Sequence, residues 1–282
     1  MNSKKIFVIL ELFITFGLLA QEANLTMKPI AKSKYNLEAN YQSSSYQNTT
    51  GMEMKMNISY GAKAVMEIEE VASNGSFTVL STWKDVKITF FALGKDTVVN
   101  HYDNLNIETR TVYDKSGKII KSERIDGSPS TDIAVLTIEQ IGLIMKLPIL
   151  SAKPTQQGEK WEWCTTDTIK NSRSPYATTI DLTDEYYFAG TETKDGVEYY
   201  RVNASGLRKV AGEGVQMGIE IRIEGTGMSE SYSFLDKKTL FPVFIEEKVG
   251  LDTSSMIISV AQSKAIPATQ NTTTTIKFTE IK

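Results

Sequence analysis

The sequence has one cysteine and one histidine among 282 residues. Most transition-metal sites, nucleophilic triads and redox pairs depend on these side chains, so such chemistry is disfavoured. The 31 Lys and Arg residues are scattered among 34 Asp and Glu residues, for a net charge of -3. Nucleic-acid binding needs a basic cluster, which this pattern lacks. These shortages predict a protein that is not an enzyme, needs no cofactor or metal ion, and binds no nucleic acid.

Long apolar runs are also missing, except near the amino terminus. Residues 6–19 form an apolar run that contains Glu11, follows Lys4 and Lys5, and precedes the small residue Ala20. This order predicts a signal peptide over residues 1–20, because a spanning helix needs about 20 residues with few charges. No cysteine follows the run to carry a lipid. We therefore expect an exported protein, periplasmic or secreted, with no membrane span after cleavage.

Threonine and serine are abundant, at 54 residues, and alternate with apolar residues along much of the chain. Alternation with a period of two is typical of β-strands with one apolar face. Asn74-Gly75 lies between two such runs and predicts a hairpin with a type I′ turn. We expect a further hairpin over residues 113–118. Two final strands are expected over residues 256–263 and 274–281, separated by a polar loop. The fold class is therefore all-β and mainly antiparallel.

One segment of the mature chain has a helical pattern. Thr137 and Gln140 form a capping box, and Ile138, Ile141 and Met145 follow with helical spacing before Pro148. We expect one short helix here, followed by a linker over residues 148–158.

The second half of the chain repeats landmarks of the first. Asp195-Gly196 corresponds to Asn74-Gly75, and Asp236 corresponds to Asp114, at offsets of 121 and 122 residues. A repeat this long predicts an internal duplication that gives two similar curved sheets or half-barrels. The expected organisation is a signal peptide (1–20), a first β half (21–130), the helix and linker (131–158) and a second β half (159–282).

Several turn and strand sequences occur along the chain in a distinctive order: Tyr35-Asn36-Leu37, Gly51 to Met56, Asn74-Gly75, Lys146-Leu147-Pro148 and Gly158 to Trp161. This succession resembles an exported Bacteroidota family described only as a domain of unknown function. The resemblance covers most of the mature chain and implies a compartment and an architecture, but no chemistry. A curved sheet is also similar, by fold-level analogy, to bacterial lipoprotein carriers of the LolA type, in which a sheet wraps an acyl-binding cavity.

Two groups of residues suggest metal binding. Met52, Met54 and Met56 share one strand face and could suit Cu(I), but packing is the favoured interpretation because no His or Cys is adjacent. The oxygen-rich segment 103–108 departs from the EF-hand spacing, so a solvated strand edge is favoured over calcium binding. His101 is expected to be structural or exposed.

The carboxylate doublets Glu69-Glu70, Asp184-Glu185 and Glu246-Glu247 could suggest a glycosidase. Adjacent strand residues point to opposite faces, so no doublet is a ready-made catalytic pair. Cys164 is expected to be a small buried residue, since no histidine lies near it in sequence to activate a thiol.

A sheet with one apolar face must cover it by closing, by pairing the halves or by binding a ligand. The leading hypothesis is a non-enzymatic protein that holds a lipid-like or hydrophobic ligand on a curved apolar face. The candidate lining residues, each of which could instead be ordinary core, are Met52, Met54, Met56, Met66, Ile68, Phe77, Val79 and Trp83. The alternative is a structural or protein-interaction module of the cell envelope or surface. It would use strand edges and exposed tyrosines such as Tyr186, Tyr187, Tyr199 and Tyr200.

Overall fold

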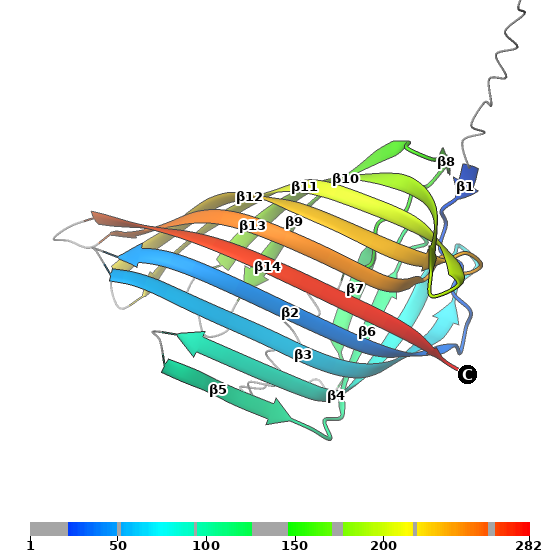
Figure 1. Ribbon diagram of the computed structural model, residues 1–282, viewed down its shortest axis with the longest axis horizontal. Coiled ribbons are helices and arrows are strands. Elements are labelled where there is room, and N and C mark those ends of the chain that lie inside the picture. Colours follow the sequence, from blue (N-terminus) through cyan, green and yellow to red (C-terminus); the bar gives the residue numbers. More distant parts are fainter. Residues whose placement is uncertain are drawn as a thin grey trace, which may run out of the picture.

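The computed structural model describes residues 22–49, 52–92, 95–125, 146–170, 177–216, 219–258 and 263–282. Within these ranges the chain is all-β (Figure 1). The strands are β1 (Glu22–Asn24), β2 (Lys34–Thr49), β3 (Met52–Val71), β4 (Phe77–Ala92), β5 (Lys95–Tyr102), β6 (Ile107–Tyr113), β7 (Ile119–Arg124), β8 (Pro154–Gln156), β9 (Lys160–Lys170), β10 (Ala177–Lys194), β11 (Val197–Gln216), β12 (Ile219–Asp236), β13 (Pro242–Ile258) and β14 (Ser263–Ile281). The predicted all-β, antiparallel class is confirmed. The predicted signal peptide and most of the predicted helix, up to residue 145, lie outside the described residues.

Twelve of the strands form one antiparallel sheet, where two separate sheets were expected. Its order is β7-β6-β4-β3-β2-β14-β13-β12-β11-β10-β9, with β5 also paired to β4. The two halves join where β2 pairs with β14, from Lys34 opposite Ile281 to Gln47 opposite Ala268. Backbone hydrogen bonds along this ladder make the halves one continuous structure.

The sheet curls so that its two outer edges approach each other at one end. The Lys118 ammonium, just before β7, lies 4.8 Å from the ring centroid of Trp163 on β9. Two irregular segments cross the remaining gap. Met27 donates its N–H to the Lys115 carbonyl, and Leu150 donates to the Ser116 carbonyl. These segments are joined by the two-stranded sheet β1–β8, so residues 22–33 and 146–156 together plug this end.

Most predicted hairpins are confirmed, with one change of turn type. Asp195 and Gly196 both have positive φ, of 53° and 77°, in the two-residue turn between Lys194 and Val197, as a type I′ turn requires. At Asn74-Gly75 the predicted I′ turn is wrong. Of these two residues, Gly75 alone has positive φ, and Ala72 donates its N–H to the Ser76 carbonyl across a longer loop.

The polar loop predicted between the last two strands is also wrong, because residues 267–273 belong to β14. Pro267, Thr269 and Asn271 alternate along this stretch and are exposed to solvent, where polar side chains are expected. Threonine also suits a strand. Pro267 has no N–H to donate, which a sheet tolerates where one side is unpaired. Pairing with β2 begins at Ala268, so Pro267 lies beyond the end of that ladder.

The same local geometry occurs in both halves. Lys32 donates to the Ile68 carbonyl and Ile68 donates to the Ser33 carbonyl; Gly158 and Phe188 repeat this exchange in the second half. A register shift follows in each case, at Ile68/Glu70 and at Phe188/Gly190. The Asp114 and Asp236 carboxylates each accept backbone N–H bonds within their own turns.

Candidate functional site

The concave face of the sheet is densely packed at the plugged end, which we call the core end. Buried side chains from both halves form one cluster there, with contributions from β2, β3, β4, β6, β10 and β11 and from the two plug segments. Tyr35 stacks on Phe241 at 4.8 Å between ring centroids, and Phe77 stacks on Tyr113 at 5.2 Å. At this end, protein side chains cover the apolar face.

Five of the predicted lining residues belong to this core. Met66, Ile68, Phe77, Val79 and Trp83 are each at most 2% exposed. The Trp83 indole N–H is also satisfied, because it donates to Thr109 Oγ1 at 3.1 Å. These side chains are already covered by protein, so they offer no open surface to a ligand.

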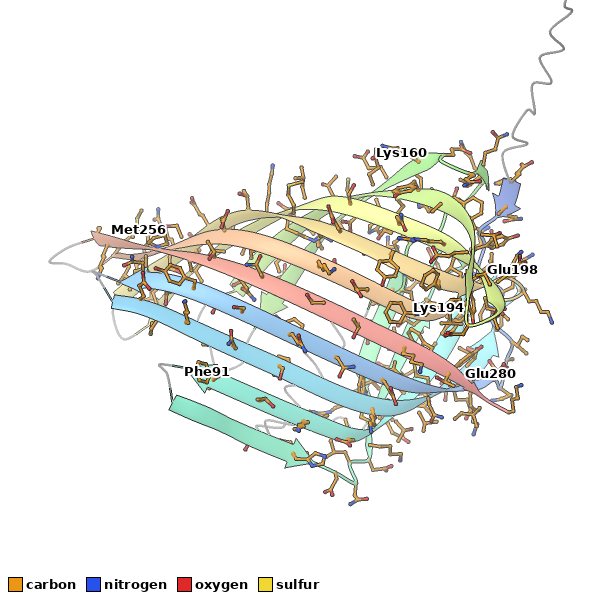
Figure 2. The ribbon with its side chains drawn as sticks, viewed as in Figure 1. Phe91, Lys160, Lys194, Glu198, Met256 and Glu280 are labelled. Atoms are coloured by element: carbon orange, nitrogen blue, oxygen red, sulfur yellow. The ribbon has the colours of Figure 1, made fainter. Side chains whose placement is uncertain are left out.

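The other predicted residues lie toward the opposite end of β3, away from the core. Met54 and Met56 are each 38% exposed, and the side chain of Met52 lies outside the described part of the chain. Figure 2 shows Phe91 and Met256 at this far end of the sheet, with Glu198 and Glu280 at the core end. The predicted set is therefore divided between two regions.

Beyond the core the concave face carries apolar side chains on β3, β4, β12 and β13, with polar ones such as Ser45 and Gln270 between them on β2 and β14. Register with Met54 and Met56 places Ile58 and Phe90 on this face of β3 and β4, and Leu251 occupies the same face of β13. Each of these side chains is at least partly exposed, and Phe90 is 37% exposed. We call this region the open face; its members are Met54, Met56, Ile58, Phe90, Ile221, Ile223, Val249, Leu251 and Ile257.

A charged cluster lies on the concave face between the core and the open face. Arg208 on β11 donates from Nη1 to Asp184 Oδ1 at 2.5 Å and from Nη2 to Glu247 Oε1 at 3.0 Å. The side chains of Arg208 and Asp184 are 8% and 13% exposed, and that of Glu247 is 29% exposed. Glu247 is therefore the member most open to solvent.

Gly206 makes room for this cluster. A Cβ atom added at Gly206 would lie 1.9 Å from Asp184 Oδ1 and 2.7 Å from Arg208 Nη1. The ion pair thus occupies the space directly above the Gly206 backbone. On β12, Arg208 faces Gly227 in register, and Ser229 lies beside it, so small residues let the guanidinium reach across to β13.

Electrostatics keep Arg208 charged. Burial alone would lower the pKa of its guanidinium, but the hydrogen bonds and charges of Asp184 and Glu247 outweigh this and raise the pKa. With both carboxylates ionised, the three residues carry a net charge of -1.

Sequence reasoning did not find this cluster. Asp184 and Glu247 were recognised as members of carboxylate doublets, but their partners in the doublets point away, as expected: Glu185 pairs with Lys160 and Glu246 with Lys248. Arg208 carries no motif, and 39 residues separate it from Glu247. The glycine at position 206, two residues before Arg208 on the same strand face, was the one local signal.

A neutral polar network lies near the charged cluster, on β2 and β14. Gln270 Nε2 donates to Ser43 Oγ at 2.9 Å, and Thr272 Oγ1 lies 3.5 Å from the same hydroxyl. Thr274, opposite Glu247 in register, is also buried. Together with the charged cluster, these residues form a polar belt across the concave face.

Two side chains on β9 and β10 differ from expectation. Cys164 is exposed and not buried, because Trp161 and Trp163 take the inward positions of β9. Tyr186 was expected to be exposed but is buried against Trp161, with ring centroids 5.9 Å apart. Tyr187, Tyr199 and Tyr200 are half-buried.

A cluster of rings and cations lies on the convex face at the core end. The hairpin between β10 and β11 bends over the ends of β12 and β13 (Figure 1). It carries the Lys194 ammonium to 4.6 Å from the Phe244 ring centroid, and the Arg201 guanidinium lies 5.0 Å from that of Tyr232. Cation–π contacts of this kind stabilise the bent hairpin.

The candidate histidine and the oxygen-rich segment make ordinary surface contacts. His101 is exposed, as expected, with Nε2 3.0 Å from Asp85 Oδ1. In the oxygen-rich segment, Asn106 accepts a hydrogen bond from Lys84. Among the described residues, no group of three or more His, Cys, Asp or Glu side chains is placed to hold a metal ion.

The sequence matches no protein-family model and no curated protein. Among solved structures, an outer membrane channel from Pseudomonas putida F1 covers 89% of this chain and 97% of its own length, at 7% identity and a TM-score of 0.26. OccK7 (OpdD) of Pseudomonas aeruginosa covers 89% of this chain and 100% of its own length, at 6% identity and a TM-score of 0.25. TM-scores this low do not establish a shared fold. In the described part of the chain, no helix is long and apolar enough to span a membrane.

Proposed function

We propose that this protein is an exported, non-enzymatic carrier that binds a lipid-like or hydrophobic ligand on the open face. The observation that carries the proposal is that apolar side chains on the concave face past the packed core are exposed (Met56, Phe90) or partly exposed (Ile58, Leu251). They form two groups, on β3–β4 and on β12–β13, with the polar side chains of Ser45 and Gln270 between them. Soluble proteins rarely leave large contiguous apolar patches uncovered, and each Å² covered by a ligand contributes about 25 cal/mol.

The curvature of the sheet favours a ligand over a flat partner. The core that fills the core end includes Phe188 on β10 as well as Val79 on β4, so the sheet encloses this face from both sides. Concave apolar surfaces with a few polar groups are typical of small-molecule sites. The polar belt around Arg208 supplies such groups at one boundary of the open face.

We further propose that the scaffold arose by internal duplication and that the chain is a relative of the exported Bacteroidota family of unknown function. The duplication is supported by the repeated exchange of hydrogen bonds at Ile68 and Phe188, 120 residues apart, and by the equivalent Asp114 and Asp236 turns. In the sheet the halves follow one another in the same direction, with β14 inserted between β2 and β13.

Native mass spectrometry and lipid extraction test the carrier proposal on protein purified from its own host. We expect an added mass that organic extraction recovers as an amphipathic lipid. A clean unliganded mass with no recovered lipid would argue against a carrier.

Two neighbouring phenylalanines provide a matched pair of variants. Phe90 lies on the concave face opposite Ile58, whereas Phe91 lies on the convex face opposite Asn57. We expect Phe90→Ser to weaken binding of a hydrophobic fluorescent probe by about tenfold, the loss of roughly 1.5 kcal/mol of burial, and Phe91→Ser to leave it unchanged. Equal effects of both variants would contradict binding on the open face.

An interaction module of the cell envelope is the second candidate, favoured by the convex cluster of Lys194, Arg201 and Tyr232. Aromatic residues and arginine are enriched at protein interfaces. A partner chain that co-purifies, and that is lost on Tyr232→Ala, would support this function over the carrier.

A further inference from the structure

We infer that the ligand of the open face is an amphipathic amine, whose ammonium group binds Glu247 and whose apolar chain lies along the open face. This inference rests on the proposed function and names the chemistry of the ligand. Its basis is the composition, exposure and position of the charged cluster.

The charged cluster has one more negative charge than positive. Arg208 bonds to one oxygen of each carboxylate, Asp184 Oδ1 and Glu247 Oε1. A carboxylate can accept hydrogen bonds at both of its oxygens, so each carboxylate keeps a second acceptor. A second cation next to Glu247 would neutralise the cluster, which is favourable where water is partly excluded.

The exposed fractions of the three side chains identify Glu247 as the residue that contacts the ammonium group of the ligand. Its side chain is 29% exposed, against 13% for Asp184 and 8% for Arg208. Arg208 and Asp184 also pack directly against the Gly206 backbone, within 2.7 Å of where a Cβ atom there would lie. A ligand that approaches along the concave face therefore meets the Glu247 carboxylate first.

The open face begins immediately beside this carboxylate. Val249 and Leu251 follow Glu247 on the same face of β13, and the polar residues Thr253 and Ser255 precede Ile257 near the far end. From Glu247 to Ile257 the strand extends about 33 Å at 3.3 Å per residue. One acyl chain spans about half of a bilayer core, or ~15 Å, so it fits within this length.

The same cluster disfavours an anionic head group. The one described cation within hydrogen-bond distance of the cluster carboxylates, Arg208, is already shared between them. A fatty-acid carboxylate would add a third negative charge to this site without a free cation to receive it. Gln270 and Ser43, on the neighbouring strands, offer neutral contacts only.

Three probes with the same chain test the inference by calorimetry below their micellar concentrations: dodecylammonium, dodecanol and dodecanoate. We expect dodecylammonium to bind at least ~10-fold more tightly than dodecanoate, since charge-assisted hydrogen bonds are the stronger class. Glu247→Gln should weaken dodecylammonium about tenfold and leave dodecanol unchanged, which also shows that the variant is folded.

Glu69→Gln is the matched control, because Glu69 accepts two hydrogen bonds from Arg110 outside the concave face. It should change the affinity of none of the probes. Equal binding of dodecylammonium and dodecanoate, or equal weakening of all three probes by Glu247→Gln, would overturn the amine inference while leaving a hydrophobic carrier intact. If none of the probes binds, the proposed function itself is wrong.

Discussion

At the scale of single residues, Gly206 shows how a missing side chain supports a charged one. The Asp184–Arg208 pair fills the volume where a Cβ atom at position 206 would lie. Removing one partner of a buried pair leaves an unpaired charge, which is costly. The cluster therefore depends on the glycine as much as on its charged members.

We predict that Gly206→Ala destabilises the protein by about 1–3 kcal/mol, because the added methyl group forces the ion pair to move. Gly61→Ala is the control, since a Cβ there would meet Asn40 Oδ1 at an ordinary 3.6 Å. Its effect should stay within ~0.5 kcal/mol. Urea unfolding midpoints measure both, and equal midpoints for the two variants would contradict the steric role of Gly206.

Two buried tyrosines predict a loss of stability at high pH. Burial raises the pKa of Tyr113 and Tyr186 well above the ordinary value near 10, and the charges of Asp184 and Glu247 add to the effect at Tyr186. Their phenols stay neutral in the folded protein but ionise near pH 10 when unfolded. The folded protein therefore has its full stability with respect to these two phenols below pH 10. This stability is lost as the pH rises through the folded-state pKa.

Each of these tyrosines should lower the free energy of unfolding by up to ~1.4 kcal/mol per pH unit above pH 10. Urea titrations between pH 8 and 11.5 measure how steeply the free energy of unfolding falls with pH. Tyr113→Phe should reduce this slope by the contribution of one tyrosine. An unchanged slope in Tyr113→Phe would show that this phenol ionises equally in both states.

At the scale of elements, the segments outside the large sheet are part of the core. Leu25 is fully buried in the segment between β1 and β2, and Leu147 and Leu150 are buried in the segment before β8. Gly117, with φ of 95°, lets the turn before β7 approach the Pro148 carbonyl. The predicted linker is therefore a packed plug at its described residues.

We predict that Leu25→Ala costs about 2–5 kcal/mol, as a buried large-to-small change does. Ile30→Ala, in the same segment, should have an effect within ~0.5 kcal/mol because Ile30 is 59% exposed. Thermal or urea unfolding compares the two. Similar small losses of stability for both variants would mean that the segment contributes little to the core.

The positions of the strands were predicted well at the hairpins and poorly where a strand is polar on both faces. The β10–β11 and β6–β7 hairpins were recognised because Asp195-Gly196 and the Asp114 turn determine their own backbone geometry. Residues 267–273 were taken for a loop, since threonines with no apolar neighbours look alike in a loop and in a strand. Pairing with β13 and β2 decided the outcome.

At the scale of the whole molecule, one sheet and one core span both halves of the chain. The core cluster includes Trp83 and Phe77 from the first half and Phe188 and Val202 from the second. A shared core couples the stability of the halves, so the expected folding unit is the complete sheet.

We predict a single unfolding transition that is the same for tryptophan probes in either half. Trp83→Phe leaves Trp161 and Trp163 as reporters of the second half. The double variant Trp161→Phe and Trp163→Phe leaves Trp83 as the reporter of the first half. In each variant, fluorescence and circular dichroism should give coincident midpoints in urea. Separate transitions within one variant would show that the halves unfold independently.

The sequence by itself determined the local features: strand alternation, most hairpin positions and the poverty in catalytic side chains. These depend on residues close together in the chain. Tertiary structure alone decided that β2 pairs with β14, that Met66 and Trp83 are core while Met56 stays exposed, and that Arg208 joins Asp184 to Glu247. The physical reason is that sheet curvature and the pairing of distant strands bring these residues together, and no short stretch of sequence encodes either.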